Sequence, residues 1–121
     1  LEDTLIDGKE NWDVTGVVLK DREVLSTDGV MIIGGGVNFK TKKVINGPDV
    51  QTRGLIYLKD AEHIIKEVGN IMEECINTAV EEKRYENLTV RGEARDKIVR
   101  YLLKETGKRP MVLPVIIEIN E

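Results

Sequence analysis

The stretch that decides the fold is Asp60–Lys83, DAEHIIKEVGNIMEECINTAVEEK. Its apolar residues recur at spacings of three and four, which places them on one face of a long α-helix. Asp60 stands where an N-cap residue belongs. Gly69 costs about 1 kcal/mol relative to Ala in a helix interior, and one reason for it would be the close packing of another backbone. The predicted inner face consists of Ala61, Ile64, Ile65, Val68, Met72, Cys75, Ile76, Ala79 and Val80.

A second helix and a last strand follow the connection Tyr85–Leu88. Gly107 stands where a left-handed helix cap belongs, and Pro110 prevents the helix from resuming. Met111–Ile119 is apolar almost throughout and predicts a strand. Pro114 removes one ladder donor, so we expect this strand at a sheet edge or bulged there. The inner face of the second helix is predicted from Val90, Ala94, Ile98, Tyr101 and Leu102.

Short apolar runs separated by turn residues precede the first helix and predict strands. They lie within residues 16–25, 30–39, 44–45 and 55–58, and the Asn46–Asp49 turn interrupts them, since Pro48 cannot lie in a central strand. Gly34–Gly36 predicts a bulge or an irregular turn. The expected fold is α+β, a small, mostly antiparallel sheet packed on two helices in the order β-β-β-β-α-α-β. Residues 1–12 are polar and read as a linker, and residues 13–121 as the domain.

Length and composition fit one globular domain, with 121 residues, 40% of them hydrophobic and 4% aromatic. The formal net charge of −4 weakly repels RNA, since phosphate contacts dominate nucleic-acid affinity. The single cysteine, Cys75, favours a reducing compartment such as the cytoplasm, and no signal peptide or membrane span is predicted. Weak local contacts with an RNA backbone remain open for Lys40, Lys42, Lys43, Lys104, Lys108 and Arg109.

Residues that could carry chemistry are scarce. His63 is the only histidine, and with Cys75 it does not make a zinc site of usual spacing. A phosphate-binding reading of Gly34–Gly36 would need a helix N-terminus directly after it, and the following residues look extended. We therefore predict no catalytic and no metal-binding residue in this chain.

Three segments are more specific: DREVLSTDG at 21–29, GPD at 47–49 followed by Arg53-Gly54, and KRPMVLPVI at 108–116. Their order and spacing resemble the C-terminal domain of bacterial ribonuclease J, over nearly the whole chain from residue 13 to 119. Two positions depart from the family pattern. Gly34–Gly36 replaces an unbroken aliphatic strand, and Lys108 replaces an arginine. The resemblance marks Asp21, Arg22, Asp28, Gly29, Gly47, Pro48, Asp49, Arg53, Gly54, Arg109, Pro110 and Pro114 as motif residues.

The resemblance implies a non-catalytic domain of a larger enzyme. Members of the family are metal-dependent 5′-to-3′ exo- and endoribonucleases of RNA processing and decay. Their zinc site lies in an upstream metallo-β-lactamase domain with an inserted β-CASP domain, so no cofactor is expected in this chain. The resemblance also implies that the C-terminal domain supports assembly, with the enzyme's own catalytic domains and another subunit as partners, and meets RNA through the parent.

Two other functions remain open from the residues, an autonomous RNA-binding module and a small ligand-binding regulatory domain. Two helices cover only one face of a sheet, yet the predicted strands are apolar at consecutive positions, hence on both faces. We therefore expect a homodimer, or a cover formed by residues 1–12. We expect Arg53 to be structural, with its guanidinium tying Asp49 or backbone carbonyls together.

Overall fold

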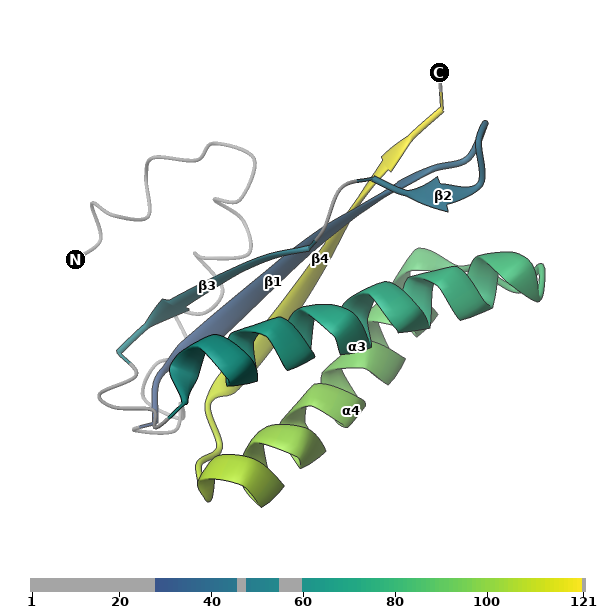
Figure 1. Ribbon diagram of the computed structural model, residues 1–121. Coiled ribbons are helices and arrows are strands. Elements are labelled where there is room, and N and C mark those ends of the chain that lie inside the picture. The colour runs from purple at the N-terminus through teal and green to yellow at the C-terminus, as the bar shows by residue number, and fades with distance from the viewer. Residues whose placement is uncertain (1–27, 46–47, 55–59, 121) are drawn as a thin grey trace.

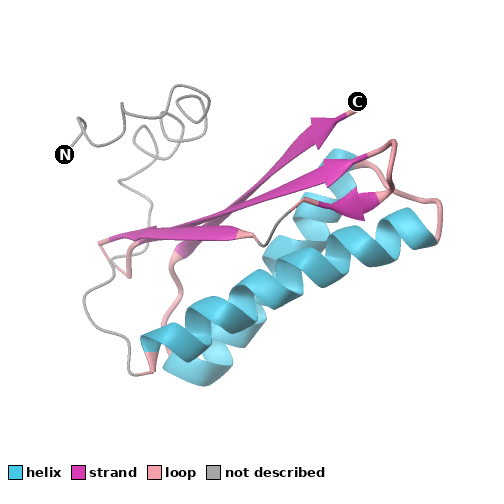
Figure 2. Cartoon of the chain, turned by 45° about the horizontal axis from the view of Figure 1, so that its top comes forward, coloured by secondary structure: helices cyan, strands magenta, loops and turns pink. Residues whose placement is uncertain are grey.

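The computed structural model describes residues 28–45, 48–54 and 60–120. In chain order it contains β1 (Val30–Asn38), β2 (Lys43–Val44), β3 (Asp49–Arg53), α3 (Ala61–Glu81), α4 (Asn87–Thr106) and β4 (Met111–Ile119). The two helices lie side by side on one face of the sheet (Figure 1), and Figure 2 shows the same two layers from another direction. The α+β class predicted from the sequence is confirmed. The predicted strands at 16–25 and 55–58 lie outside the described residues.

Strand β1 is the centre of the sheet. It pairs antiparallel with β2 and β3 and parallel with β4, which runs beside it along all nine residues. The Gly36 carbonyl accepts from Ile45 N–H, whereas Phe39 N–H donates to Ile119. Alternate residues of β1 therefore form their backbone hydrogen bonds on opposite sides of the strand. Strands β2 and β3 lie end to end on one side, and β4 lies on the other. A parallel pair needs a long crossover, and here the two helices form part of it.

The glycine run is regular strand, so the expected bulge or irregular turn is wrong. Gly34 pairs with Asp49 on one side and Val115 on the other, within an unbroken register. A Cβ built on Gly35 would lie 3.2 Å from Ile76 Cδ1. The missing side chain therefore lets α3 pack closely on the strand.

Residues of both helices and of the inner sheet face form the core. The buried stripe of α3 agrees with the predicted face, and Gly107 ends α4 in the left-handed conformation with φ 75°. Asp60 does precede α3, but it has φ 60° and makes no side-chain cap hydrogen bond, which corrects its expected role. The core is built from Met31, Ile33, Val37, Ile64, Val68, Met72, Cys75, Ile76, Ala79, Val90, Ala94, Ile98, Leu102, Val112 and Ile116.

Strand β4 is an edge of the described sheet, as Pro114 predicted. Met111 N–H donates to the Gly29 carbonyl. The odd-numbered residues of β4 therefore direct their backbone N–H and C=O groups toward β1, and the even-numbered residues direct theirs away from it. The nitrogen of Pro114 therefore faces the open edge, where a missing donor breaks no ladder bond. On that edge the Ile116 carbonyl accepts from Asn87 Nδ2 at 3.2 Å.

Candidate assembly surface

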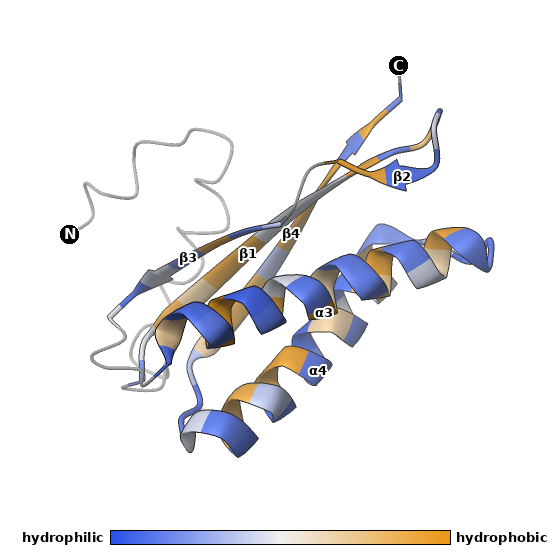
Figure 3. Cartoon of the chain, in the orientation of Figure 1, coloured by the Kyte–Doolittle hydropathy of each residue, from blue (hydrophilic) through white to orange (hydrophobic). Residues whose placement is uncertain are grey.

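The face of the sheet opposite the helices is mostly apolar along β1 and β4 and polar along β3, and no described element covers it. In β1 the side chains of Met31 and Ile33 point to the helices, so Ile32 and Gly34 point outward. In β4, Val115 and Ile117 share that outer face through the register with Gly34 and Gly36. Ile117 is 56% exposed. Figure 3 shows hydrophobic stretches along both long strands.

The glycines shape this outer face into a shallow hollow of about 290 Å³. A Cβ on Gly34 would meet only the Asp49 carbonyl oxygen, at 3.9 Å, and one on Gly36 would meet Ile45 at 3.4 Å. Aliphatic side chains surround the glycine floor, and two polar side chains from β3 stand at its rim. We call this the outer-face surface; its side chains are Ile32, Ile45, Asp49, Gln51, Val115, Ile117 and Ile119.

One end of the sheet brings together residues from all three motif segments, whereas Pro48, Asp49 and Pro114 lie farther along the strands. The Asp28 carboxylate accepts from Arg109 N–H at 2.7 Å, which joins the first motif to the third. Gly29 has φ 97°, and a Cβ there would lie 2.8 Å from the Arg53 carbonyl oxygen, which brings in the second motif. Pro110 is buried beside them. Asp21, Arg22 and Gly47 lie outside the described residues.

Arg53 makes one of the two kinds of contact expected of it. It is exposed, and its Nη1 donates to the carbonyl of the adjacent Thr52 at 2.8 Å. Asp49 instead accepts from Gln51 at 3.1 Å. Four strand positions, about 13 Å, separate Asp49 from Arg53. The described structure therefore shows the expected kind of carbonyl contact at Thr52, but no contact between Arg53 and Asp49.

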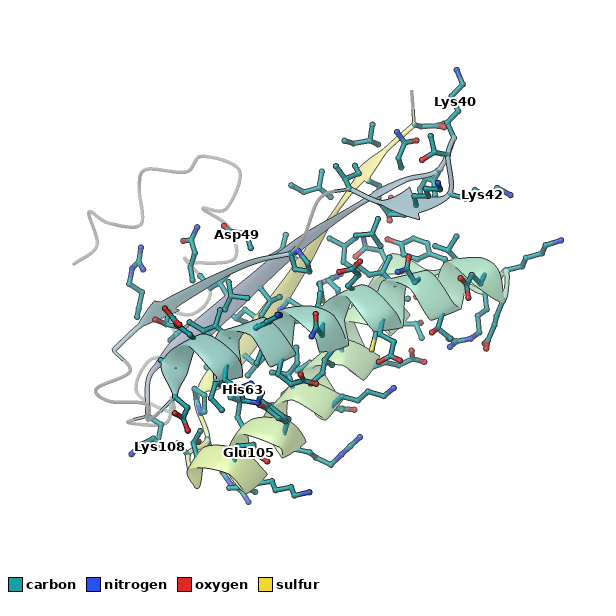
Figure 4. The ribbon with its side chains drawn as sticks, viewed as in Figure 1. Lys40, Lys42, Asp49, His63, Glu105 and Lys108 are labelled. Atoms are coloured by element: carbon teal, nitrogen blue, oxygen red, sulfur yellow. The ribbon has the colours of Figure 1, made fainter. Side chains whose placement is uncertain are left out.

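The basic residues form two separate clusters. Lys40, Lys42 and Lys43 lie at the β1–β2 turn. Lys104 lies in the last turn of α4, and Lys108 and Arg109 follow that helix. Figure 4 shows Lys40 and Lys42 at one end of the sheet and Lys108 at the other. The nine-residue strands that separate them are about 30 Å long. These six residues therefore do not form a single basic face for an RNA backbone.

The single histidine and the single cysteine lie in different environments. His63 is exposed on α3, whereas Cys75 is buried in the core. Burial raises the pKa of the Cys75 thiol above its ordinary value, because the thiolate would lose its hydration. Within the described ranges, no three residues among His, Cys, Asp and Glu are placed so that they could hold a metal ion.

A polar cluster that the sequence did not predict joins α4 to β4. The Tyr85 hydroxyl donates to Glu118 Oε2 at 2.7 Å, and Asn87 Nδ2 donates to the same oxygen at 2.8 Å. The ring of Tyr85 also meets Phe39 edge-on, with centroids 5.3 Å apart. Desolvation and the Glu118 carboxylate raise the pKa of the Tyr85 hydroxyl. The only signal in the sequence was one acid within an apolar strand.

Comparison with known proteins agrees with the convergence of the three motifs. The family model described as "Ribonuclease J C-terminal domain" matches residues 17–119. The chain belongs to the ribonuclease J C-terminal domain family. It is 36% identical over 115 residues to "Ribonuclease J 2" of Staphylococcus aureus strain NCTC 8325 / PS 47 and to "Ribonuclease J 2" of Staphylococcus epidermidis strain ATCC 35984. Each match covers 95% of this chain and 21% of the relative, so the chain spans about one fifth of these ribonucleases.

Within the described residues, no helix of this ribonuclease J domain is both long and apolar enough to cross a membrane.

Proposed function

We propose that this chain is the non-catalytic assembly domain of a ribonuclease J, and that its outer-face surface packs against a second copy of the domain. The parent enzyme would be a zinc-dependent 5′-to-3′ exo- and endoribonuclease of RNA processing and decay in the cytoplasm. Its metal and its catalytic residues would belong to domains outside this chain. RNA would reach this domain through the parent, and no membrane is involved.

The observation that carries the proposal is the apolar outer face. Apolar side chains that gather on one uncovered face of a sheet favour an interaction site. Ile32, Val115 and Ile117 surround a glycine floor that side chains of a partner can enter. Covering these groups removes apolar area from water, which stabilises by roughly 25 cal/mol per Å².

The polar residues of β3 favour a second copy as the partner. Asp49 and Arg53 stand on the outer face of the same strand, on either side of Gln51. A two-fold axis near Gln51 would bring Asp49 of each copy to Arg53 of the other. Such self-complementarity is what an isologous interface requires. It also gives the exposed guanidinium of Arg53 a role that the isolated chain does not supply.

Ile117→Glu tests the surface. We expect light scattering across a dilution series to give a dimer for the wild type and 13.7 kDa for the variant, because the new carboxylate would be buried without a partner. Leu103→Glu is the matched control, since Leu103 is exposed on α4, on the other layer. A wild-type mass that stays monomeric to millimolar concentration would reject the second copy as partner.

The absence of catalysis is tested separately. The purified chain with 5′-labelled single-stranded RNA and added zinc or manganese should release no product, because a catalytic metal takes about three protein ligands. Metal-dependent cleavage that co-purifies with the folded chain would contradict a non-catalytic role. Tight RNA binding by the chain alone would instead support the RNA-binding alternative.

A further inference from the structure

A groove separate from the outer-face surface runs between α4 and the open edge of β4. It has a volume of about 320 Å³. Val112, Leu113 and Pro114 line its β4 side, and Leu88, 65% exposed, stands on its α4 side. Gly92 widens it, since a Cβ built there would meet nothing within 4 Å. Because the groove is apolar and Leu88 is exposed beside it, an aliphatic side chain would fit there.

The groove also offers backbone hydrogen bonds. The even-numbered residues of β4 direct their backbone groups away from β1, so Val112 presents both its N–H and its C=O to the groove. Pro114 presents a carbonyl and no N–H. Asn87 already satisfies the Ile116 carbonyl. No described strand pairs with this short stretch of edge. It suits a brief extended peptide, and Pro114 prevents the pairing from continuing as a full strand.

Two guanidinium groups, those of Arg91 and Arg95, line the groove. Arg91 Nε donates to the amide oxygen of Asn87, an uncharged partner. Arg95 lies 3.4 Å from Asp96 in a pair whose side chains are more than half exposed, and such pairs contribute little. The nearby Glu118 is engaged by Tyr85 and Asn87. An occupant with carboxylates would therefore gain charge-assisted hydrogen bonds here.

We propose that the groove binds the first seven residues of this same chain, Leu1–Asp7. The segment reads LEDTLID, with aliphatic residues at positions 1, 5 and 6 and acids at positions 2, 3 and 7, and it contains no Lys or Arg. Its aliphatic side chains match the floor of the groove and its three carboxylates match the two arginines. This proposal does not depend on the assembly role of the outer face.

The chain enters the described fold beside the groove. Asp28 accepts from the N–H of Arg109, three residues before Val112. About 20 residues separate the segment from Asp28, and they reach roughly 66–72 Å when extended, far more than the groove requires. A short tether supplies an effective concentration in the millimolar range. Even a contact with a Kd of about 1 mM would therefore be half occupied.

RNA fits the groove less well than this segment. The lining contains no aromatic ring on which a base could stack. Its floor is aliphatic, whereas an RNA backbone requires rows of cations. Only two cations are present in the lining, and the chain as a whole carries a net charge of −4.

The test is amide NMR of the intact 121-residue chain. The first variant neutralises the segment through Glu2→Gln, Asp3→Asn and Asp7→Asn. We expect it to shift the amide signals of Leu88, Gly92, Val112 and Leu113, because the occupant leaves. The matched control neutralises three other acids of the N-terminal region, through Glu10→Gln, Asp13→Asn and Glu23→Gln, and should leave those four signals in place.

The reciprocal variant, Arg91→Gln with Arg95→Gln, should shift the amide signals of residues 1–7, whereas Arg100→Gln with Lys104→Gln should not. Added salt should move the groove signals of the wild type toward those of the variant with the neutralised segment, since salt screens exposed charges. Groove signals that are identical in wild type and neutralised segment would overturn the proposal. So would shifts that disappear on dilution, which would assign the contact to a second copy. The other outcome is that a uridine oligonucleotide shifts the groove signals equally in the wild type and in the neutralised-segment variant. If neutralising the acids alone shifted nothing, that result would assign the groove to RNA.

Discussion

Replacing Gly69 by Ala should stabilise the domain, although Gly69 is buried in the middle of α3. A Cβ at this position would lie 3.8 Å from Pro48 Cβ and 3.9 Å from Pro48 Cγ, which is ordinary van der Waals contact. Helix propensity alone favours Ala by about 1 kcal/mol. Burying one methyl group against the proline ring adds up to about 0.8 kcal/mol. The expected gain in the free energy of unfolding is therefore about 1–2 kcal/mol.

Urea unfolding followed by circular dichroism measures the gain, and thermal unfolding should show an increase in Tm of about 4–8 °C per kcal/mol. Gly92→Ala is the matched control. Gly92 lies inside α4 with nothing within 4 Å of the added Cβ, so it should gain the propensity term alone. The difference between the two variants isolates the contact with Pro48. A loss of stability in Gly69→Ala, alongside a gain in Gly92→Ala, would refute the packing described for Pro48.

Three further perturbations follow from the geometry. Gly29→Ala should lower the free energy of unfolding by at least about 1–3 kcal/mol, because φ is 97° and the Cβ would meet the Arg53 carbonyl oxygen at 2.8 Å; an unchanged urea midpoint would contradict this. Arg53→Ala should change the stability of the monomer by less than about 0.5 kcal/mol, since its side chain is exposed and bonds only a neighbouring carbonyl in the described structure, and a larger loss at a concentration where the chain is monomeric would count against that. Stability should fall as pH rises above 9, because burial raises the pKa of Cys75 from 9.0 and the pKa of Tyr85 from 10.0, so both groups ionise first in the unfolded chain. Urea midpoints at about pH 8 and about pH 10.5 measure this loss; Tyr85→Phe should cost about 1 kcal/mol at the lower pH and reduce the alkaline loss, and equal losses in both proteins would exclude Tyr85 as a contributor.

The helices could be predicted because their signals are local. The apolar period in α3 and the glycine cap of α4 each depend on a few neighbouring residues. Pro114 likewise predicted an edge strand, since any central position would have lost a ladder bond. The ribonuclease J family could be predicted as well, because its motif residues serve contacts such as that of the Asp28 carboxylate with the backbone N–H of Arg109, which requires an acceptor side chain at position 28.

Features that depend on which distant segments meet could not be predicted. The glycines of β1 indicated a bulge, because their use becomes visible only when Ile76 of α3 packs against Gly35. Arg53 was assigned a partner from its neighbours in sequence, but the extended backbone carries it away from Asp49. The cluster of Tyr85, Asn87 and Glu118 joins residues about 30 positions apart, and no local pattern in the sequence marks such a contact.

The parallel pairing of β1 with β4 has a consequence for synthesis of the chain. The longest ladder joins the first and the last strands described, and Val30 pairs with Met111 across about 80 intervening residues. A ribosome must therefore release residues up to Ile119 before β1 gains this neighbour. Until then the inner faces of α3 and α4 lack Val112 and Ile116, two of their buried contacts. Pairings this distant in sequence form slowly. A chain terminated before Met111 would lack these contacts, and we expect proteases to cleave it faster than the complete domain.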